Sequence, residues 1–117
     1  MGVEMNKATV RRLMEDVWHQ QNLDAVSEVF AADLVYHQPN TDDIVGTNGY
    51  REFCEYVLSS FPDIHFEVKT LFAEGDYVAG HWAFDAPGKG VKREGIDLYR
   101  MSEGQIAEMW SVRGDWD

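Results

Sequence analysis

The sequence contains little of what several classes of protein require. Its 117 residues include one cysteine and only ten Lys and Arg residues, against 21 Asp and Glu, which gives a net charge of −11. A lone cysteine, Cys54, excludes an intrachain disulfide and a cysteine-rich zinc site. An acidic chain repels phosphate backbones and anionic lipids, so we expect neither a nucleic-acid partner nor a membrane partner.

Long apolar runs and targeting patterns are also missing. No stretch reaches the length of a transmembrane helix, and the N-terminus lacks a basic segment followed by an apolar run. Together with the single cysteine, this favours a cytoplasmic location. Because there is no repeat, low-complexity run or linker of Pro, Gly and Ser, residues 1–117 are predicted to form one domain.

The apolar residues that are present change their spacing along the chain. They follow a helical period over residues 10–18 and 50–61, with a short helix between them that Asn22 or Asp24 can cap. After Pro62 the period becomes two, which predicts strands over about 64–69, 77–84, 94–101 and 105–112, beside an earlier short strand at 34–37. The sequence therefore predicts an α+β fold, with three N-terminal helices packed on a strongly curved antiparallel sheet.

Short motifs along almost the whole chain resemble one family. In order they are NLDAV (22–26), FAAD (30–33), VYHQP (35–39), Gly46 with YREF (50–53), FPDIHF (61–66), EGDYVA (74–79), HW (81–82), GIDLYRM (95–101) and EGQIAEMW (103–110). This series is similar to the SnoaL-like polyketide cyclases of the nuclear transport factor 2-like superfamily. The resemblance implies a cone with an internal pocket, and a homodimer formed through the outer face of the sheet.

Asp97 is the first candidate for catalysis. It lies in mid-strand between Ile96 and Leu98, where a carboxylate is unfavourable unless it is hydrogen-bonded, protonated or hydrated. An apolar pocket raises the pKa of a carboxyl group and lets it donate a proton near neutral pH. The segment around Asp97 also resembles the ketosteroid isomerase strand that carries a protonated oxyanion-hole aspartate. The alternative is a solvated side chain, or one paired with Arg93 or Arg100.

Two histidines are the candidate bases. His37 follows an apolar strand, next to the position that the general base of ketosteroid isomerases occupies, although a structural histidine bonded to a loop is the alternative. His81 alternates with Trp82, so only one of the two can face the pocket. We expect His81 inside, because Ala79 and Ala83 would leave space for a ligand, and Trp82 on the dimer face; the inverse assignment stays open.

The last strand departs from the family pattern. In SnoaL-like cyclases a catalytic aspartate lies just after the tryptophan that corresponds to Trp110, and here that position holds Ser111. Either Asp115 replaces this acid or the acid is absent. The residues expected to bind substrate are Tyr99, Trp18, Arg113, Ser111 and Met109.

Neither a cofactor nor a metal is expected. The histidines show no i, i+4 pairing, and the Gly88-Lys89-Gly90 turn lacks the strand–loop–helix context of a phosphate-binding loop. Two functions remain open. One is an enzyme that carries out acid/base chemistry of the isomerase, cyclase or dehydratase type on a small hydrophobic carbonyl compound. The other is a non-catalytic dimeric binding module for an apolar metabolite.

Overall fold

The computed structural model describes residues 2–114. The helical elements are α1 (Val3–Arg12), η1 (Leu13–His19), η2 (Leu23–Ala25), α2 (Val26–Val29), α3 (Gly46–Ser60) and η3 (Pro87–Lys89). The strands are β1 (Phe30–His37), β2 (Ile44–Val45), β3 (His65–Glu74), β4 (Tyr77–Ala86), β5 (Val91–Ser102) and β6 (Gln105–Gly114). These elements confirm the predicted α+β class.

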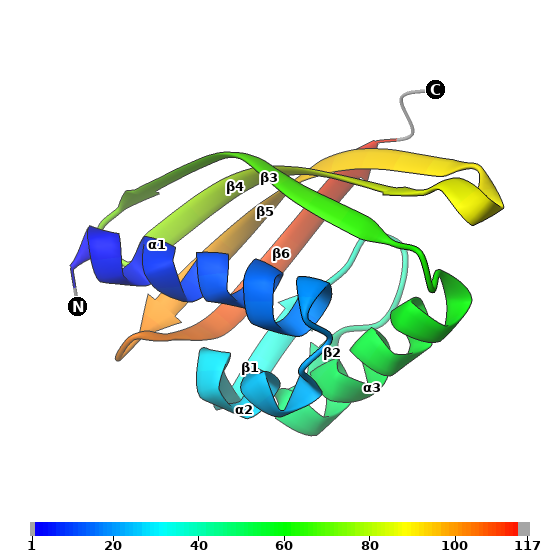
Figure 1. Cartoon of the computed structure of the whole chain (residues 1–117). Coiled ribbons are helices and arrows are strands. Elements are labelled where there is room, and N and C mark those ends of the chain that lie inside the picture. The colour runs from blue at the N-terminus through cyan, green and yellow to red at the C-terminus, as the bar shows by residue number, and fades with distance from the viewer. Residues whose placement is uncertain (1, 115–117) are drawn as a thin grey trace.

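The strands form one curved sheet in the order β2-β1-β6-β5-β4-β3. Figure 1 shows this sheet arching over the helices, which lie on its concave side. All pairings are antiparallel except that between β1 and β6, which is parallel. The predicted curved antiparallel sheet is confirmed, with one parallel pairing that the sequence did not indicate. After β1 and β2, the chain passes through α3 to β3. The three hairpin connections from β3 to β6 then place β6 beside β1, with the two strands running in the same direction.

The core lies between the concave face of the sheet and the helices. Its fully buried members include Val10, Leu13, Val17, Val26, Val29, Phe30, Leu34, Tyr50, Cys54, Val78, Tyr99 and Ile106. Cys54 is a buried member of this cluster, as its position on the apolar stripe of α3 suggests.

The first helix widens in its second half. Residues Leu13–His19 form a π-helical segment, and the N–H of Gln20 bonds the carbonyl of Glu15 five residues back at 2.9 Å. The wider turn buries Met14 and Trp18 together with Leu13 and Val17. Segments of this kind often occur at functional sites. Here the segment directs two side chains, Met14 and Trp18, into the space below the sheet.

Cross-strand register decides which side chains share a face of the sheet. On the inner face, Val68, Trp82, Gly95 and Arg113 form one row across β3 to β6, and Leu71, Gly80, Asp97 and Ser111 form the next. On the outer face the corresponding rows are Phe72, Ala79, Leu98 and Trp110, and Thr70, His81, Ile96 and Val112. A register shift between Val68 and Thr70 keeps both parts of β3 in step with this pattern.

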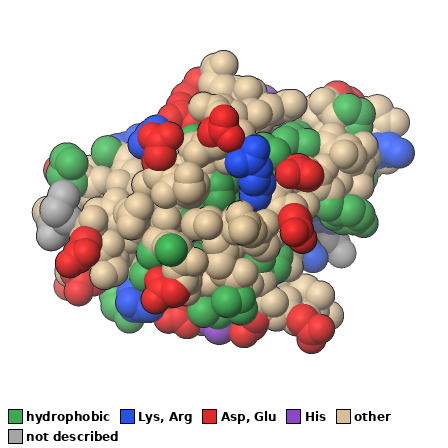
Figure 2. Space-filling model, turned by 90° about the horizontal axis from the view of Figure 1, so that it is seen from below, with side chains coloured by type: hydrophobic (Ala, Val, Ile, Leu, Met, Phe, Trp, Pro, Cys, Tyr) green, Lys and Arg blue, Asp and Glu red, His purple; other side chains and the backbone are tan. Residues whose placement is uncertain are grey.

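Figure 2 shows the distribution of charged side chains on one face of the molecule. Seen from below, acidic side chains are scattered over the face rather than gathered in one patch (Figure 2). Among the described residues, no helix is long and apolar enough to cross a membrane.

The Gly95→Ala substitution tests the packing of β5 against Trp82. A Cβ at Gly95 would lie 2.5 Å from Trp82 Cζ2 and 2.5 Å from the Val112 carbonyl oxygen. Because backbone cannot move aside, we expect the free energy of unfolding to fall by about 1–3 kcal/mol in urea denaturation. The control is Gly49→Ala, where the Cβ meets only the side-chain methyl of Ile44 at 3.1 Å. It should change stability by less than about 1 kcal/mol. Equal effects of the two substitutions would contradict this account of Gly95.

Candidate active site

A cavity of about 250 Å³ opens between the helices and the inner face of the sheet. Most of its wall is aromatic, formed by Trp18, Tyr36, Tyr50, Phe53, Tyr56, Phe61, Phe66, Trp82 and Phe84. Two charged side chains, Asp97 and Arg113, also line it, together with the polar Gln38 and Ser111. The cavity thus offers a largely aromatic space, and its polar groups come from β5, β6 and the residue that follows β1.

Asp97 is the buried carboxyl group of this cavity. Its side chain is 4% exposed, in mid-strand on the inner face of β5. Ser111 Oγ donates to Asp97 Oδ1 at 2.6 Å, and the Tyr99 hydroxyl donates to Oδ2 at 3.0 Å. Gly80 stands beside Asp97 on β4 and Ser111 beside it on β6, so the neighbouring strands leave room for the carboxyl group. The alternative of a surface ion pair with Arg93 or Arg100 is wrong, because Asp97 faces inward.

Burial raises the pKa of Asp97 from its ordinary value of 3.8 to about 6, because the apolar surroundings disfavour a charge. Hydrogen bonds from Ser111 and Tyr99 and the proximity of Trp82 oppose this rise by favouring the carboxylate. A carboxyl group balanced in this way changes its protonation state close to neutral pH, which suits a residue that both accepts and returns a proton.

Trp82 covers Asp97 from β4. Its indole ring lies over Gly95, where only the absence of a side chain leaves space for it. The buried indole nitrogen makes no hydrogen bond with good geometry to any residue that the structure describes. It is nevertheless close enough to the Asp97 carboxylate to favour the charged form. Trp82 is thus both a wall of the cavity and an electrostatic neighbour of its acid.

Tyr36 approaches the same network from β1. Its hydroxyl lies 2.7 Å from Ser111 Oγ, which in turn donates to Asp97. Burial, and then the nearby charge of Asp97, raise the pKa of Tyr36 above its ordinary value. The phenol therefore keeps its proton throughout the neutral range.

Both predicted catalytic histidines lie on the other face of the sheet. His81 is absent from the cavity lining, and its Nε2 lies 3.0 Å from Glu94 Oε1 with 41% of its side chain exposed. Placing His81 inside was wrong, because the small residues Ala79 and Ala83 belong to the outer face, whereas Gly95 makes room for Trp82 on the inner one.

His37 also points outward. It stacks on Trp110, with Nδ1 3.0 Å from Asp43 and Nε2 2.6 Å from Glu108. The hydrogen bond with Glu108 raises the pKa of His37 and stabilises the imidazolium. Strand alternation turns Tyr36 and Gln38, rather than His37, toward the cavity. The expectation that His37 serves as a base at the cavity mouth is therefore wrong, and the alternative of a structural histidine fits the contacts.

Comparison with known proteins places this arrangement in a family. The sequence model of the SnoaL-like polyketide cyclases matches residues 8–115. The chain belongs to this family. No curated protein matches the sequence.

Solved structures share the fold at low sequence identity. A candidate SnoaL-like polyketide cyclase from Jannaschia sp. CCS1 superposes with a TM-score of 0.85 at 20% identity, over 95% of this chain and 86% of that one. A candidate ketosteroid isomerase from Kribbella flavida DSM 17836 gives 0.84 at 18% identity, over 98% and 82%. An LEH-like epoxide hydrolase from M. tuberculosis gives 0.77 at 16% identity, over 98% and 86%. Because these similar folds carry names of different chemistries, the residues in the cavity must decide the reaction.

The remaining predicted binding residues divide into two groups. Trp18, Met109, Ser111 and Arg113 line the cavity of this SnoaL-like chain. Tyr99 does not line it, but it supports Asp97 from behind through its hydroxyl group. The family resemblance implies a catalytic acid at the position of Ser111. The hydroxyl group of Ser111 instead donates a hydrogen bond to Asp97. Asp115, the other candidate for that acid, lies outside the described residues.

Among the cavity residues that were not predicted to belong to the site, Tyr36, Gln38 and Trp82 lie near its polar groups. The signal for the first two was present, since they flank His37 and therefore face opposite to it on an extended strand. Trp82 was considered but was assigned to the wrong face. Within residues 2–114, no group of three or more His, Cys, Asp or Glu side chains is arranged to hold a metal ion.

The raised pKa of Asp97 predicts a pH-dependent difference in stability between the wild type and Asp97→Asn. The folded-state pKa of about 6 lies above the unfolded value of 3.8, so the folded protein binds the proton more tightly. The resulting stabilisation is complete below the unfolded pKa and is lost as the pH rises through about 6. Relative to Asp97→Asn, the wild type should lose about 3 kcal/mol of unfolding free energy between pH 3.5 and 7.5.

Urea denaturation across this pH range measures the effect. Any change in hydrogen bonding with the asparagine amide adds an offset that does not depend on pH, so the slope is the test. Parallel stability curves for the two proteins would show that the pKa of Asp97 is not raised by folding.

Proposed function

We propose that this SnoaL-like protein is an enzyme that moves a proton next to the carbonyl group of a small hydrophobic compound, using its own side chains and no cofactor. The observation that carries the proposal is the buried Asp97 at the polar side of an aromatic cavity, with a pKa of about 6. Above that pH the carboxylate accepts a proton from the carbon, and the acid so formed returns it.

The cavity supports a flat, apolar substrate. Its aromatic walls favour a conjugated or ring-shaped body and exclude water, which strengthens electrostatic interactions inside. Gln38 and Arg113 lie at the polar side of the cavity. The guanidinium of Arg113 would stabilise the negative oxygen of an enolate bound there. Isomerisation, aldol-type cyclisation and dehydration all pass through such an enolate.

A second candidate is a non-catalytic binding module for an apolar metabolite. The observation in its favour is Ser111, which stands where the family resemblance implies a catalytic aspartate. A binding module would hold the same compounds in the same cavity without exchanging their protons. The two functions are therefore separated by a proton-exchange experiment.

The Asp97→Asn substitution tests the proposed catalysis on 2-tetralone, a hydrophobic ketone with acidic protons. NMR in deuterium oxide would measure the loss of protons next to the carbonyl group. Because general acid–base catalysis contributes about 10²- to 10⁴-fold, we expect Asp97→Asn to slow the enzymatic exchange at least 100-fold. The rate of the wild type should rise with pH through one ionisation near 6.

The outer-face histidines provide the matched controls. His37→Gln and His81→Gln each remove an imidazole that lies outside the cavity. Both variants should exchange at the wild-type rate. Binding of 2-tetralone without exchange by the wild type would favour the binding module, and loss of exchange in a histidine variant would contradict the assignment of the base.

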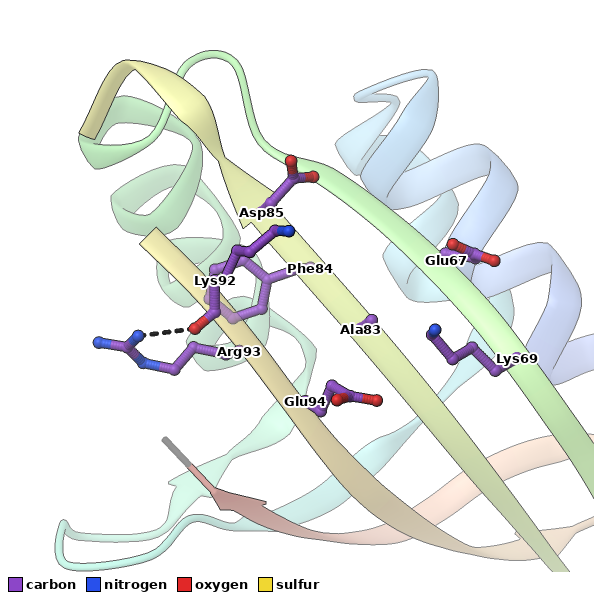
Figure 3. Close-up of a pocket in the computed structure, with 8 residues that line it drawn as sticks. All are labelled: Glu67, Lys69, Ala83, Phe84, Asp85, Lys92, Arg93 and Glu94. Carbon is purple, nitrogen blue, oxygen red and sulfur yellow. Dashed lines mark hydrogen bonds between the residues drawn. The ribbon is translucent and has the colours of Figure 1, made fainter. Parts of the chain in front are cut away.

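We further propose that two copies pair through the outer face of the sheet. The row Phe72, Ala79, Leu98 and Trp110 runs across four strands, and Phe72 and Leu98 are exposed. Further along the outer face, an open groove carries three acidic side chains, Glu67, Asp85 and Glu94, and two basic ones, Lys69 and Lys92, whereas Arg93 points away from them (Figure 3). This near balance contrasts with the net charge of −11 and suits a surface that meets its own copy about a two-fold axis.

The Leu98→Lys substitution tests this pairing. It places a charge in the middle of the apolar row, so a dimer through this face would bury two like charges near each other. We expect the dissociation constant to rise at least about 100-fold in sedimentation experiments. The control is Met5→Lys, an exposed apolar residue on α1, which should leave the dimer intact. A dimer that survives Leu98→Lys would contradict the proposed face.

A further inference from the structure

A continuous chain of hydrogen bonds joins the wall of the cavity to the buried acid. The Tyr36 hydroxyl lies 2.7 Å from Ser111 Oγ, and Ser111 Oγ lies 2.6 Å from Asp97 Oδ1. The three groups come from β1, β6 and β5, which are neighbours in the sheet. Each link is short enough for a proton to pass along a formed hydrogen bond.

The direction of the bonds follows from counting protons. Ser111 has one hydroxyl proton and donates it to the carboxylate, so it must accept at its oxygen from Tyr36. Tyr36 has then used its own proton and presents only lone pairs to a ligand. Asp97 Oδ2 accepts from Tyr99, so both carboxylate oxygens already accept a hydrogen bond, one from Ser111 in the cavity wall and one from Tyr99 behind it.

We propose that Tyr36 is the catalytic residue that contacts the substrate, and that it passes the substrate proton to Asp97 through Ser111. This inference rests on the proposed function and adds the path that the proton takes. As the bond between the carbon and its proton breaks, Tyr36 Oη takes that proton and releases its own to Ser111. Ser111 releases its proton to Asp97 Oδ1, and the electron pair of the broken bond stays on the substrate as an enolate.

The opposite sequence of transfers returns the proton. One proton moves in each direction, and no oxidant or reductant is needed. Since the pKa of Tyr36 is raised above its ordinary value, a free tyrosinate does not form first, and the three transfers must occur together. In this path Ser111 transfers a proton to Asp97, and Asp97 holds it. This role differs from that of the catalytic aspartate that the family resemblance implies at the position of Ser111.

Several groups set the charge balance around this path. Besides Tyr36, those that face Asp97 or its partners are Tyr50 and Cys54 from α3, Tyr99 from β5 and Arg113 from β6. Burial raises the pKa values of both tyrosines and of the Cys54 thiol, so these three groups remain neutral. The ionisation that controls the path near neutral pH is accordingly that of Asp97.

The test compares four variants for exchange of 2-tetralone protons with deuterium oxide. Ser111→Ala breaks the path but keeps both ends, and Tyr36→Phe removes the end that meets the substrate. Each should lower kcat at least about 100-fold with KM changed less than about five-fold, and the double variant should be no slower than the worse single one. Ser111→Thr keeps the hydroxyl group and should restore kcat to within about ten-fold of the wild type.

Tyr99→Phe is the matched control. It removes a hydroxyl from the same carboxyl group, but one that lies off the path. It should keep kcat within about ten-fold, while the midpoint of the pH profile rises because the carboxylate has lost a donor. Thermal unfolding of each variant confirms that it is folded under the assay conditions.

The outcomes separate the relay from the proposed function. If Asp97→Asn abolishes exchange while Ser111→Ala and Tyr36→Phe retain it, Asp97 meets the substrate directly and the relay is wrong, although the function stands. If Tyr99→Phe is as slow as Tyr36→Phe, the two hydroxyls only support the carboxyl group, and the relay is again wrong. A wild type that binds 2-tetralone but exchanges no proton overturns both.

Discussion

The chemistry proposed for this cavity depends on one carboxyl group, that of Asp97, which the fold buries. Asp97 occupies a position on the inner face of the sheet where its neighbours along the chain, Ile96 and Leu98, point to the opposite face. Burial raises the pKa of Asp97 above its ordinary value, whereas Ser111, Trp82 and Tyr99 lower it by favouring the carboxylate. The opposing effects of desolvation and hydrogen bonding give a group that titrates near neutral pH.

The surrounding architecture serves to hold this group in an apolar space. Glycines on adjacent strands make the arrangement sterically possible, since Gly80 stands beside Asp97 and Gly95 lies beneath the indole of Trp82. The π-helical turn of the first helix closes the cavity from below with Met14 and Trp18. These features lie far apart in the sequence, and the register of the sheet together with the packing of the first helix against it brings them together.

The position of Ser111 separates this chain from the pattern expected of its family. The serine hydroxyl group does not ionise at neutral pH, but it can accept one proton while it donates another. It can therefore connect Tyr36 with Asp97, where an aspartate would act on a substrate directly. The fold is shared with proteins named as cyclases, an isomerase and an epoxide hydrolase, so such local exchanges are where differences in chemistry arise.

Much of the fold could be read from the sequence, because it depends on local periodicity. The apolar spacing of residues 10–18 and 50–61, with the capped segment between them, predicted the three helices. The alternation after Pro62 predicted the strands of the β3–β6 meander and hence the α+β class. Alternation also showed that His81 and Trp82 lie on opposite faces, and the apolar setting of Asp97 marked it as the unusual carboxyl group. The local pattern could not decide which face of the sheet is the inner one. Alternation with a period of two sorts the residues into two faces but does not say which of them packs against the helices.

Only the tertiary structure settled that choice. Cross-strand register puts Gly95 under Trp82, and the parallel pairing of β1 with β6 puts Tyr36 beside Ser111, through contacts between residues that are distant in the sequence. Those contacts turned His37 and His81 outward and left Asp97 as the group that titrates in the cavity. The sequence by itself therefore determined the helices and strands and marked Asp97 as the unusual carboxyl group. The packing of the strands decided which side chains, Ser111 and Tyr36 among them, surround that carboxyl group.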